Sequence, residues 1–224
     1  MSTHLIQALA LFGGSGATGQ QVISQALAQG LRVRTLVRPT ASIAVPSDAV
    51  EIRVGSLQSS GDVEDTLRGC EAVCCVFGPR PPFTDLFCAE ATQVIVDAMR
   101  RCKVERIVCQ TGAMIGEYRQ NRTWPFQLLV ELFKRVSPTL AEDRAQQEQI
   151  LRGSGLNWTL VKPPKLVNTP AQGAVAIGTE VKVGLGSQLS RVDLARFLVQ
   201  EILVPQYSEK AVFIRQKRTF LPGC

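Results

Sequence analysis

Four glycines fall within seven positions, at residues 13–19, directly after a short apolar run. The run from Ile6 to Phe12 contains no Pro and is almost entirely apolar, which is typical of a strand buried on both faces of a parallel sheet. Residues 17–29 then carry apolar side chains at helical spacing, and Gly30 follows them. The glycines therefore lie in a turn that leads from a strand into a helix.

The glycine spacing in this turn matches two nucleotide-binding patterns. Gly14, Gly16 and Gly19 fit G-x-G-x-x-G, and Gly13 with the last two fits G-x-x-G-x-x-G. Glycine permits a positive φ, and at the start of a helix it lets a pyrophosphate reach free N–H groups at the positive end of the helix dipole. We predict a dinucleotide cradle here, with a plain turn as the alternative. Its members are Gly13, Ser15, Gly16, Ala17, Thr18 and Gly19.

Strand-like and helical patterns alternate along nearly the whole chain. Strands are expected at 6–12, 32–37, 50–54, 72–77, 106–110, 158–161 and 211–214, and helices near 17–29, 62–68, 84–101, 138–153 and 191–203. Because βαβ units have right-handed crossovers, this order predicts an α/β fold with a doubly wound parallel sheet of the Rossmann type and helices on both faces. We expect one domain over residues 1–224, in which segments of about 114–138 and 165–190 fit the alternation worst.

Composition excludes several classes of protein. Hydrophobic residues at 45% and charged residues at 20% are ordinary for a globular enzyme. No apolar run approaches the roughly 18 residues of a membrane span, and no signal peptide is visible, so we expect a cytoplasmic protein. The net charge of +6 is spread over scattered basic residues without an RNA-binding signature, so no nucleic-acid partner is expected.

Cysteine and histidine usage predicts no metal site. The seven cysteines are an odd number in a chain without a secretory signal, so they are expected to be reduced thiols that pack as small hydrophobes. Cys74 and Cys75 are neighbours in a strand-like run and point to opposite faces, so they cannot share one metal ion. His4 is the single histidine, which argues against a Ser-His-Asp triad or a multi-histidine zinc site.

The end of the second predicted strand indicates which dinucleotide is bound. A site for NAD usually has Asp or Glu there, whereas the 2′-phosphate of NADP needs a positive charge. This chain has Arg38 in "VRTLVRPT" with no acid nearby, and Thr40 and Ser42 supply further hydroxyl donors. A guanidinium binds phosphate in a bidentate manner. We therefore predict NADP(H), with a surface arginine at a strand end as the alternative.

A series of motifs in order along the chain resembles one known family. The motifs are "GGSGATG", "LVRP", "VGSL", "DTLRGCEAVCCVFG", "VERIVCQTGA" and "LRGSGLNWTLVKPPKL". Together, over about residues 5–215, they are similar to the atypical short-chain dehydrogenases of the NmrA-like and biliverdin reductase B (flavin reductase) group. The resemblance implies a Rossmann core whose last third shapes the substrate pocket, so the segments of about 114–138 and 165–190 are expected there.

The resemblance implies several cofactor contacts. Gly55, Ser56 and Leu57 follow the third strand, where the family usually has an acid in the second position that binds the adenine amino group; Ser56 departs from that pattern. Phe77 and Gly78 end the fourth strand, where the family's backbone passes the cofactor ribose.

Further contacts are implied near the nicotinamide. Thr111 and Gly112 end the fifth strand beside the expected ring, and Gly112 stands where the biliverdin reductase B pattern has a serine. Lys162, Pro163 and Pro164 match the family's R-P-P-x-L-like stretch, whose backbone lies against the nicotinamide. Lys165 falls where the pattern has a histidine near the substrate, so it is a candidate to neutralise an anionic substrate group, with a solvated surface lysine as the alternative.

The proton donor of related dehydrogenases, Tyr-x-x-x-Lys, is missing. The chain has only "YRQNR", in which Tyr118 is a candidate proton donor or a loop tyrosine and Arg122 the candidate source of positive charge. Glu148 matches a helix acid common in the family, and we expect it to pair with Arg144 four positions earlier. Candidate catalytic residues are thus Thr111, Tyr118 and Lys165.

An apolar stripe lies in "WPFQLLVELFKRV", where Phe126, Leu129, Leu132 and Phe133 recur at helical spacing. This helix is expected to pack in the core, to cover an aromatic substrate or to form a dimer face. The chain is accordingly expected to be a monomer or a homodimer.

Three functions remain open. The first is an NADPH-dependent oxidoreductase acting on a conjugated planar acceptor such as a flavin, quinone, tetrapyrrole or aromatic, polyketide-like metabolite; such acceptors tolerate the missing Tyr-x-x-x-Lys. The second is a non-catalytic NADP(H) sensor or scaffold of the NmrA-like type. The third is an isomerase or dehydratase that uses the same fold without net redox change.

Overall fold

The computed structural model describes residues 6–41, 43–44, 48–79, 83 and 86–217. His4, Ser42 and Cys224 lie outside these ranges. Within the described ranges, no helix has the length and apolar character needed to cross a membrane.

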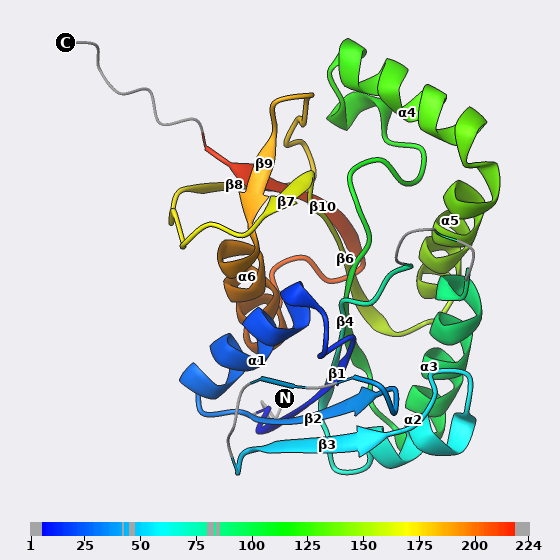
Figure 1. The fold of residues 1–224 in the computed structure, drawn as a ribbon, viewed down its shortest axis with the longest axis vertical. Coiled ribbons are helices and arrows are strands. Elements are labelled where there is room, and N and C mark those ends of the chain that lie inside the picture. The colour runs from blue at the N-terminus through cyan, green and yellow to red at the C-terminus, as the bar shows by residue number, and fades with distance from the viewer. Residues whose placement is uncertain (1–5, 42, 45–47, 80–82, 84–85, 218–224) are drawn as a thin grey trace.

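An eight-stranded sheet forms the centre of the molecule (Figure 1). Its order is β3-β2-β1-β4-β5-β6-β10-β8, and every neighbouring pair is parallel except β10 with β8. The strands are β1 (Ala8–Phe12), β2 (Arg32–Val37), β3 (Val50–Val54), β4 (Ala72–Cys75), β5 (Arg106–Gln110), β6 (Asn157–Lys162), β8 (Val175–Gly178) and β10 (Lys210–Gln216). The predicted doubly wound, mostly parallel sheet is confirmed.

Helices cover both faces of the sheet (Figure 1). The helices are α1 (Ala17–Ala28), α2 (Ser60–Leu67), α3 (Cys88–Cys102), α4 (Trp124–Val136), α5 (Pro138–Arg152) and α6 (Arg191–Leu203). Helices α1 and α6 pack on one face, and α2, α3 and α5 on the other. Alternate residues of β1 enter the two cores, with Leu9 and Leu11 on the α1 side and Ala10 and Phe12 on the α3 side. This two-sided burial explains why the first strand has a continuous apolar run.

The cysteines behave as predicted over the part of the chain that is described. The six described ones are free thiols, and five of them are buried. Cys74 lies in the α1-side core, whereas Cys75 and Cys109 lie in the α3-side core. Burial raises the pKa of Cys70 and of Cys88 to about 11, so both thiols stay protonated near neutral pH. These cysteines are packing residues.

Two segments contain structure that the alternation did not predict. Residues 165–190 form β7 (Lys165–Val167), β8 and β9 (Gln188–Ser190), with β7 and β9 paired in a separate parallel ladder. These strands, of three or four residues each, are too short to show periodicity. Residues 119–121 form the short 3-10 helix η1 (Arg119–Asn121) before α4.

Helix α4 lies at the upper edge of the molecule in Figure 1 and buries only part of its apolar stripe. Phe126 and Val130 are buried, whereas Leu129 and Leu132 are exposed. Trp124, at the start of the helix, is 76% exposed. The expectation of core packing therefore holds for one side of this helix only.

A buried ion pair joins the sheet to α6. The Arg106 guanidinium on β5 lies 2.9 Å from the Glu201 carboxylate on α6, and the two side chains are 7% and 1% exposed. Glu201 also accepts hydrogen bonds from the Thr159 hydroxyl at 3.1 Å and the Tyr207 N–H at 2.9 Å. A single carboxylate thus fixes β5, β6 and the segment before β10.

Replacing Glu201 with Ala should destabilise the fold by about 3–5 kcal/mol, because it leaves the Arg106 charge buried without its partner. Urea unfolding followed by circular dichroism measures this change. Asp97→Ala, which breaks the exposed pair with Arg100, is the control and should have a much smaller effect. Equal losses in the two variants would contradict a structural role for the buried pair.

Candidate functional site

A cavity of about 680 Å³ lies at the carboxyl ends of the strands, lined from β1, β2, β3 and β4. The chain order reverses between β1 and β4, because β2 and β3 continue on one side of β1 and β4 on the other. Ligands of open parallel sheets bind at such a switch point. The cavity brings together nine of the predicted cofactor residues: Gly13, Ser15, Gly16, Arg38, Gly55, Ser56, Leu57, Phe77 and Gly78.

The glycine turn at one wall of this cavity leaves no room for side chains. Gly13 has a φ of +99°, and a Cβ there would lie 2.7 Å from the Phe77 nitrogen. A Cβ on Gly19 would collide with the Gly13 carbonyl oxygen and lie 2.7 Å from Gly14 Cα. These two positions therefore require glycine, one for its dihedral angles and the other for the contact between α1 and the turn.

The N-terminus of α1 has the features that favour binding of an anion. Gly16 is its N-cap, and the helix has neither a side-chain cap nor an acidic residue in its first turn. The first N–H groups, around Ala17 and Thr18, are among those that an α-helix leaves without internal acceptors. Such N–H groups, with the positive end of the helix dipole, favour a phosphate.

Arg38 lies exposed at the rim of the cavity, next to Thr40. Among the described residues its guanidinium has no hydrogen-bond or ion-pair partner, in contrast to Arg34 on the preceding strand β2, which pairs with Glu51 at 2.5 Å. The Arg38 charge is therefore available to a ligand.

Asp62 is a residue that the sequence analysis missed. Its carboxylate accepts a hydrogen bond from the Ser56 N–H at 2.9 Å, and a Cβ on Gly55 would lie 2.6 Å from its Cγ. Asp62 thus supports the stretch where the family usually has its own acid. Its signal was the Ser59-x-x-Asp62 spacing of a helix N-terminus, where the Ser59 hydroxyl accepts the Asp62 N–H at 3.3 Å.

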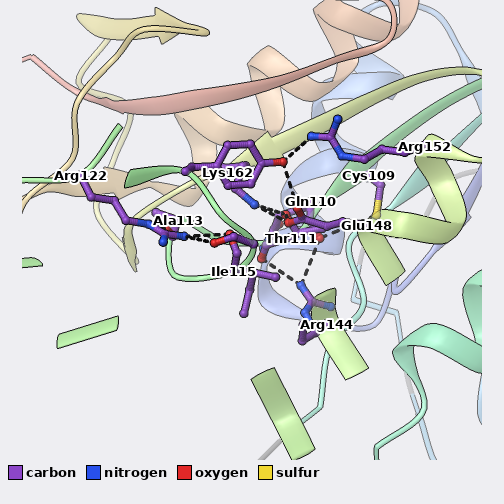
Figure 2. Close-up of polar contacts among 12 residues, drawn as sticks. Cys109, Gln110, Thr111, Ala113, Ile115, Arg122, Arg144, Glu148, Arg152 and Lys162 are labelled. Atoms are coloured by element: carbon purple, nitrogen blue, oxygen red, sulfur yellow. Dashed lines mark hydrogen bonds and ion pairs between the residues drawn. The ribbon is translucent and has the colours of Figure 1, made fainter. Parts of the chain in front are cut away.

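A buried polar cluster lies beyond β5 (Figure 2). Glu148 on α5 is ion-paired with Lys162 at the end of β6, and the two side chains are 4% and 0% exposed. The Thr111 hydroxyl donates to Glu148 Oε1 at 2.7 Å, and the Tyr118 hydroxyl donates to Glu148 Oε2 at 3.1 Å. Lys162 Nζ lies 3.4 Å from Thr111 Oγ1 and 4.3 Å from the centroid of the Tyr118 ring. A tyrosine and a lysine that are far apart in the sequence thus lie in contact in the fold.

The environment changes the acidity of both groups. Burial lowers the pKa of Lys162 from 10.5 to about 8, against the opposing effect of the Glu148 carboxylate. Burial, followed by the charge of Glu148, raises the pKa of Tyr118 to about 12. The Lys162 ammonium is therefore the more acidic of the two groups.

Two arginines have roles that differ from the prediction. Arg144 does not pair with Glu148; its guanidinium donates to the carbonyls of Phe77 at 3.2 Å and Thr111 at 2.9 Å, because Glu148 is held by Lys162. Arg122 donates to the carbonyls of Ala113 and Ile115, both at 2.8 Å, and so stabilises the loop after β5 instead of the Tyr118 hydroxyl. Figure 2 shows Arg122 with Ala113 and Ile115, and Arg144 with Thr111.

The remaining predicted residues lie at the ends of β5 and β6 and at the start of β7. The Pro163 carbonyl accepts the Ala113 N–H at 2.9 Å, which joins the two strand ends, and Pro164 is half-buried. A Cβ on Gly112 would meet no atom closer than 4.0 Å. Lys165 is exposed on β7, and no contact joins it to Thr111 or Tyr118 among the described residues.

Lys162 shows what sequence reasoning missed about this cluster. It was predicted for its backbone, yet its side chain is the fully buried partner of Glu148. The available signal was its place directly after the buried run Trp158–Val161, since a charge at the end of a buried strand needs a partner.

A second cavity, of about 560 Å³, lies next to the cluster. It is lined by the loop from Met114 to Tyr118, by Lys134 on α4 and by α5 residues that include Glu148 and Arg152. Tyr118 and Glu148 of the cluster thus line this cavity, and Thr111 contacts Glu148 at the end of β5.

Comparison with known proteins gives one family match and many similar folds. Residues 13–205 match the model of a family described as NAD(P)H-binding. An uncharacterized chloroplastic protein of Arabidopsis thaliana is 30% identical over 213 residues, which are 90% of this chain and 74% of that protein.

Solved structures of similar fold include reductases. A short-chain dehydrogenase/reductase from Veillonella parvula in complex with NADP has a TM-score of 0.79 at 16% identity, with 96% of each chain covered. The anaerobilin reductase ChuY from Escherichia coli O157:H7 has a TM-score of 0.75 at 18% identity, covering 97% of this chain and 100% of that one. At these identities the likeness shows the fold alone.

Replacing Gly19 with Ala should weaken dinucleotide binding by at least about tenfold, equivalent to roughly 1.4 kcal/mol, because the added Cβ displaces the turn from α1. Titration calorimetry with NADPH measures the affinity. Gly61→Ala is the matched control, since a Cβ at that helical glycine meets no atom within 4 Å. Unchanged affinity in the Gly19 variant would contradict the assignment of the cradle.

Proposed function

This chain belongs to the NAD(P)H-binding family, and we propose that it is an NADPH-dependent oxidoreductase that transfers hydride to a conjugated planar acceptor. The acceptor class covers flavins, quinones, tetrapyrroles and aromatic, polyketide-like metabolites. The observation that carries the proposal is the cavity at the β1/β4 switch point, with a bare glycine cradle at one wall and, at its rim, an arginine that has no ion-pair partner among the described residues.

The residues of this cavity fit a dinucleotide. Gly13 and Gly19 have no side chain, and a Cβ at either position would collide with neighbouring backbone. The turn can therefore lie close to the N-terminus of α1. The N–H groups there would hold the pyrophosphate. Ser56 and Leu57 line the wall where the adenine end is expected, with Ser56 held by Asp62. Phe77 and Gly78 line the opposite end.

Arg38 supports NADPH over NADH. Its guanidinium is exposed at the end of β2, where NAD sites carry an acid, and it has no competing acidic partner among the described residues. A charge-assisted contact to a 2′-phosphate would complete its hydrogen bonding.

The end of β5 supports a planar acceptor. When bound, NADPH supplies the hydride. Thr111 and Gly112 follow the strand, and the absence of a side chain at Gly112 leaves open space at that point. Phe77 and Phe87, which line the cavity at the β1/β4 switch point, stack at 5.8 Å between ring centroids. The apolar rings of Phe77 and Phe87, together with the missing side chain at Gly112, suit a flat conjugated ring.

The non-catalytic sensor is the second candidate, and one observation favours it. The pKa of Tyr118 is raised to about 12, whereas a tyrosine proton donor of the Tyr-x-x-x-Lys type needs a lowered value. A sensor would bind oxidised and reduced cofactor with very different affinities and consume neither.

Turnover distinguishes the two functions. The oxidoreductase is expected to oxidise NADPH in the presence of flavin, dichlorophenol-indophenol or a quinone, followed as loss of reduced-nicotinamide absorbance. Binding of NADP and NADPH is measured in parallel. Tight binding without turnover of any of these acceptors would overturn the oxidoreductase in favour of the sensor.

Replacing Arg38 with Glu should weaken NADPH relative to NADH by about 2–4 kcal/mol, because an attractive charge becomes a repulsive one. Calorimetric affinities for the two cofactors measure the difference. Arg68→Glu, an exposed arginine outside the cavity, serves as the control for net charge. Equal losses for NADH and NADPH in the Arg38 variant would mean that it does not recognise the phosphate.

A further inference from the structure

The buried cluster beyond β5 connects the second cavity to the expected reaction site. Tyr118 and Glu148 both line that cavity, and Tyr118 is half-buried. The Glu148 carboxylate accepts hydrogen bonds from both sides: Oε2 from the Tyr118 hydroxyl at 3.1 Å and Oε1 from the Thr111 hydroxyl at 2.7 Å. Lys162 Nζ bonds to Glu148 Oε1 and lies 3.4 Å from Thr111 Oγ1. The groups form one continuous chain between the cavity and the end of β5.

We propose that Lys162 supplies the proton that the acceptor needs after hydride transfer, by way of the Thr111 hydroxyl, and that the second cavity is the solvent entry through which Lys162 is reprotonated. This inference rests on the proposed function, because it requires an acceptor beside Thr111. In this proposal Lys162 is the source of the proton. Glu148 and Tyr118 hold Lys162 in place and pass the proton that restores its ammonium form.

The proton balance of the step is complete. The acceptor becomes an anion when it takes hydride. The Thr111 hydroxyl, which donates to Glu148 Oε1 in this structure, turns to the anionic atom and gives it its hydrogen, and its O–H bond breaks as the new bond forms. The Thr111 oxygen takes a proton from the Lys162 ammonium, which becomes a neutral amine. Solvent in the second cavity then protonates Lys162 through the Tyr118 hydroxyl and Glu148, with no other co-reactant.

The groups around Lys162 shift its pKa in opposite directions. The Glu148 carboxylate on α5 favours the ammonium, whereas Arg122 in the loop and Arg144 on α5 disfavour it. The Tyr118 ring and the Phe213 ring on β10 lie against it, at 4.3 and 5.9 Å from Nζ to the ring centroids. Burial outweighs the other effects and brings the pKa of Lys162 to about 8, so the ammonium is present at neutral pH and is lost as the pH rises above that value.

The acidity also explains why the lysine and not the tyrosine is the source. A proton donor works best with a pKa close to the working pH, and the pKa of Tyr118 is about 12. Arginine at position 162 would keep the ion pair with Glu148, but it does not release a proton in proteins. Lys162→Arg therefore separates the charge of this residue from its acidity.

The test compares the wild-type protein with Lys162→Arg. In the cofactor-free protein, the side-chain NMR signals of Lys162, assigned by their absence in the variant, should titrate near pH 8. With NADPH and the best acceptor, the wild-type rate should fall above about pH 8. The variant should bind NADPH equally well, lose this pH-dependent fall and react about 10²-fold more slowly, with a changed solvent deuterium isotope effect. Lys210→Arg, at an exposed lysine on β10, is the matched control.

Each outcome decides between the two proposals. A Lys162→Arg protein with the wild-type rate and the wild-type fall above pH 8 overturns proton supply by Lys162 while the oxidoreductase stands. A wild-type protein that binds NADPH but reduces no acceptor overturns both. If Lys162→Arg does not fold, Thr111→Val takes its place, since it keeps the ion pair and removes the hydroxyl; the same loss of rate supports the proposal, and an unchanged rate overturns it.

Discussion

The close approach of the glycine turn to its neighbours is the constraint on which the rest of this structure depends. Gly13 meets the backbone of Phe77 at the end of β4, and Gly19 brings α1 against the Gly13 carbonyl. No side chain fits at either point, so the start of α1 is held over the gap between β1 and β4. The cavity forms there because the sheet reverses its strand order at that position.

In the other half of the molecule, Glu148 is the residue that holds the neighbouring segments together. One carboxylate on α5 holds the hydroxyls of Thr111 and Tyr118 and the ammonium of Lys162. Because these groups come from β6 and from two parts of the segment after β5, the pair fixes the end of the sheet and the loop together. A buried pair contributes little net stability but is costly to break once it has formed, so this pair holds the surrounding groups in one geometry.

Local patterns predicted a set of residues that the fold then brings together. The turn, the strand ends and Arg38 all follow strongly periodic segments, and the topology brings them to one cavity. The late segment was predicted poorly, because β7 and β9 are short strands that pair with each other across an intervening loop. The expected Arg144–Glu148 pair was wrong for a similar reason: helical spacing allows it, but the backbone carbonyls at the ends of β4 and β5 hold Arg144 elsewhere.

The sequence by itself determined the class of fold and the cofactor class, because glycine dihedrals, alternating apolar runs and a charge at a strand end act within a few residues of the chain. Only the tertiary structure decided which side chains meet Thr111. Lys162 lies 51 positions from Thr111 and 14 from Glu148, and no local pattern links them. Their contact, and the shift in the pKa of Lys162 that follows, arises from burial at the junction of β5, β6 and α5, where a charge excluded from water must find its partner in the protein.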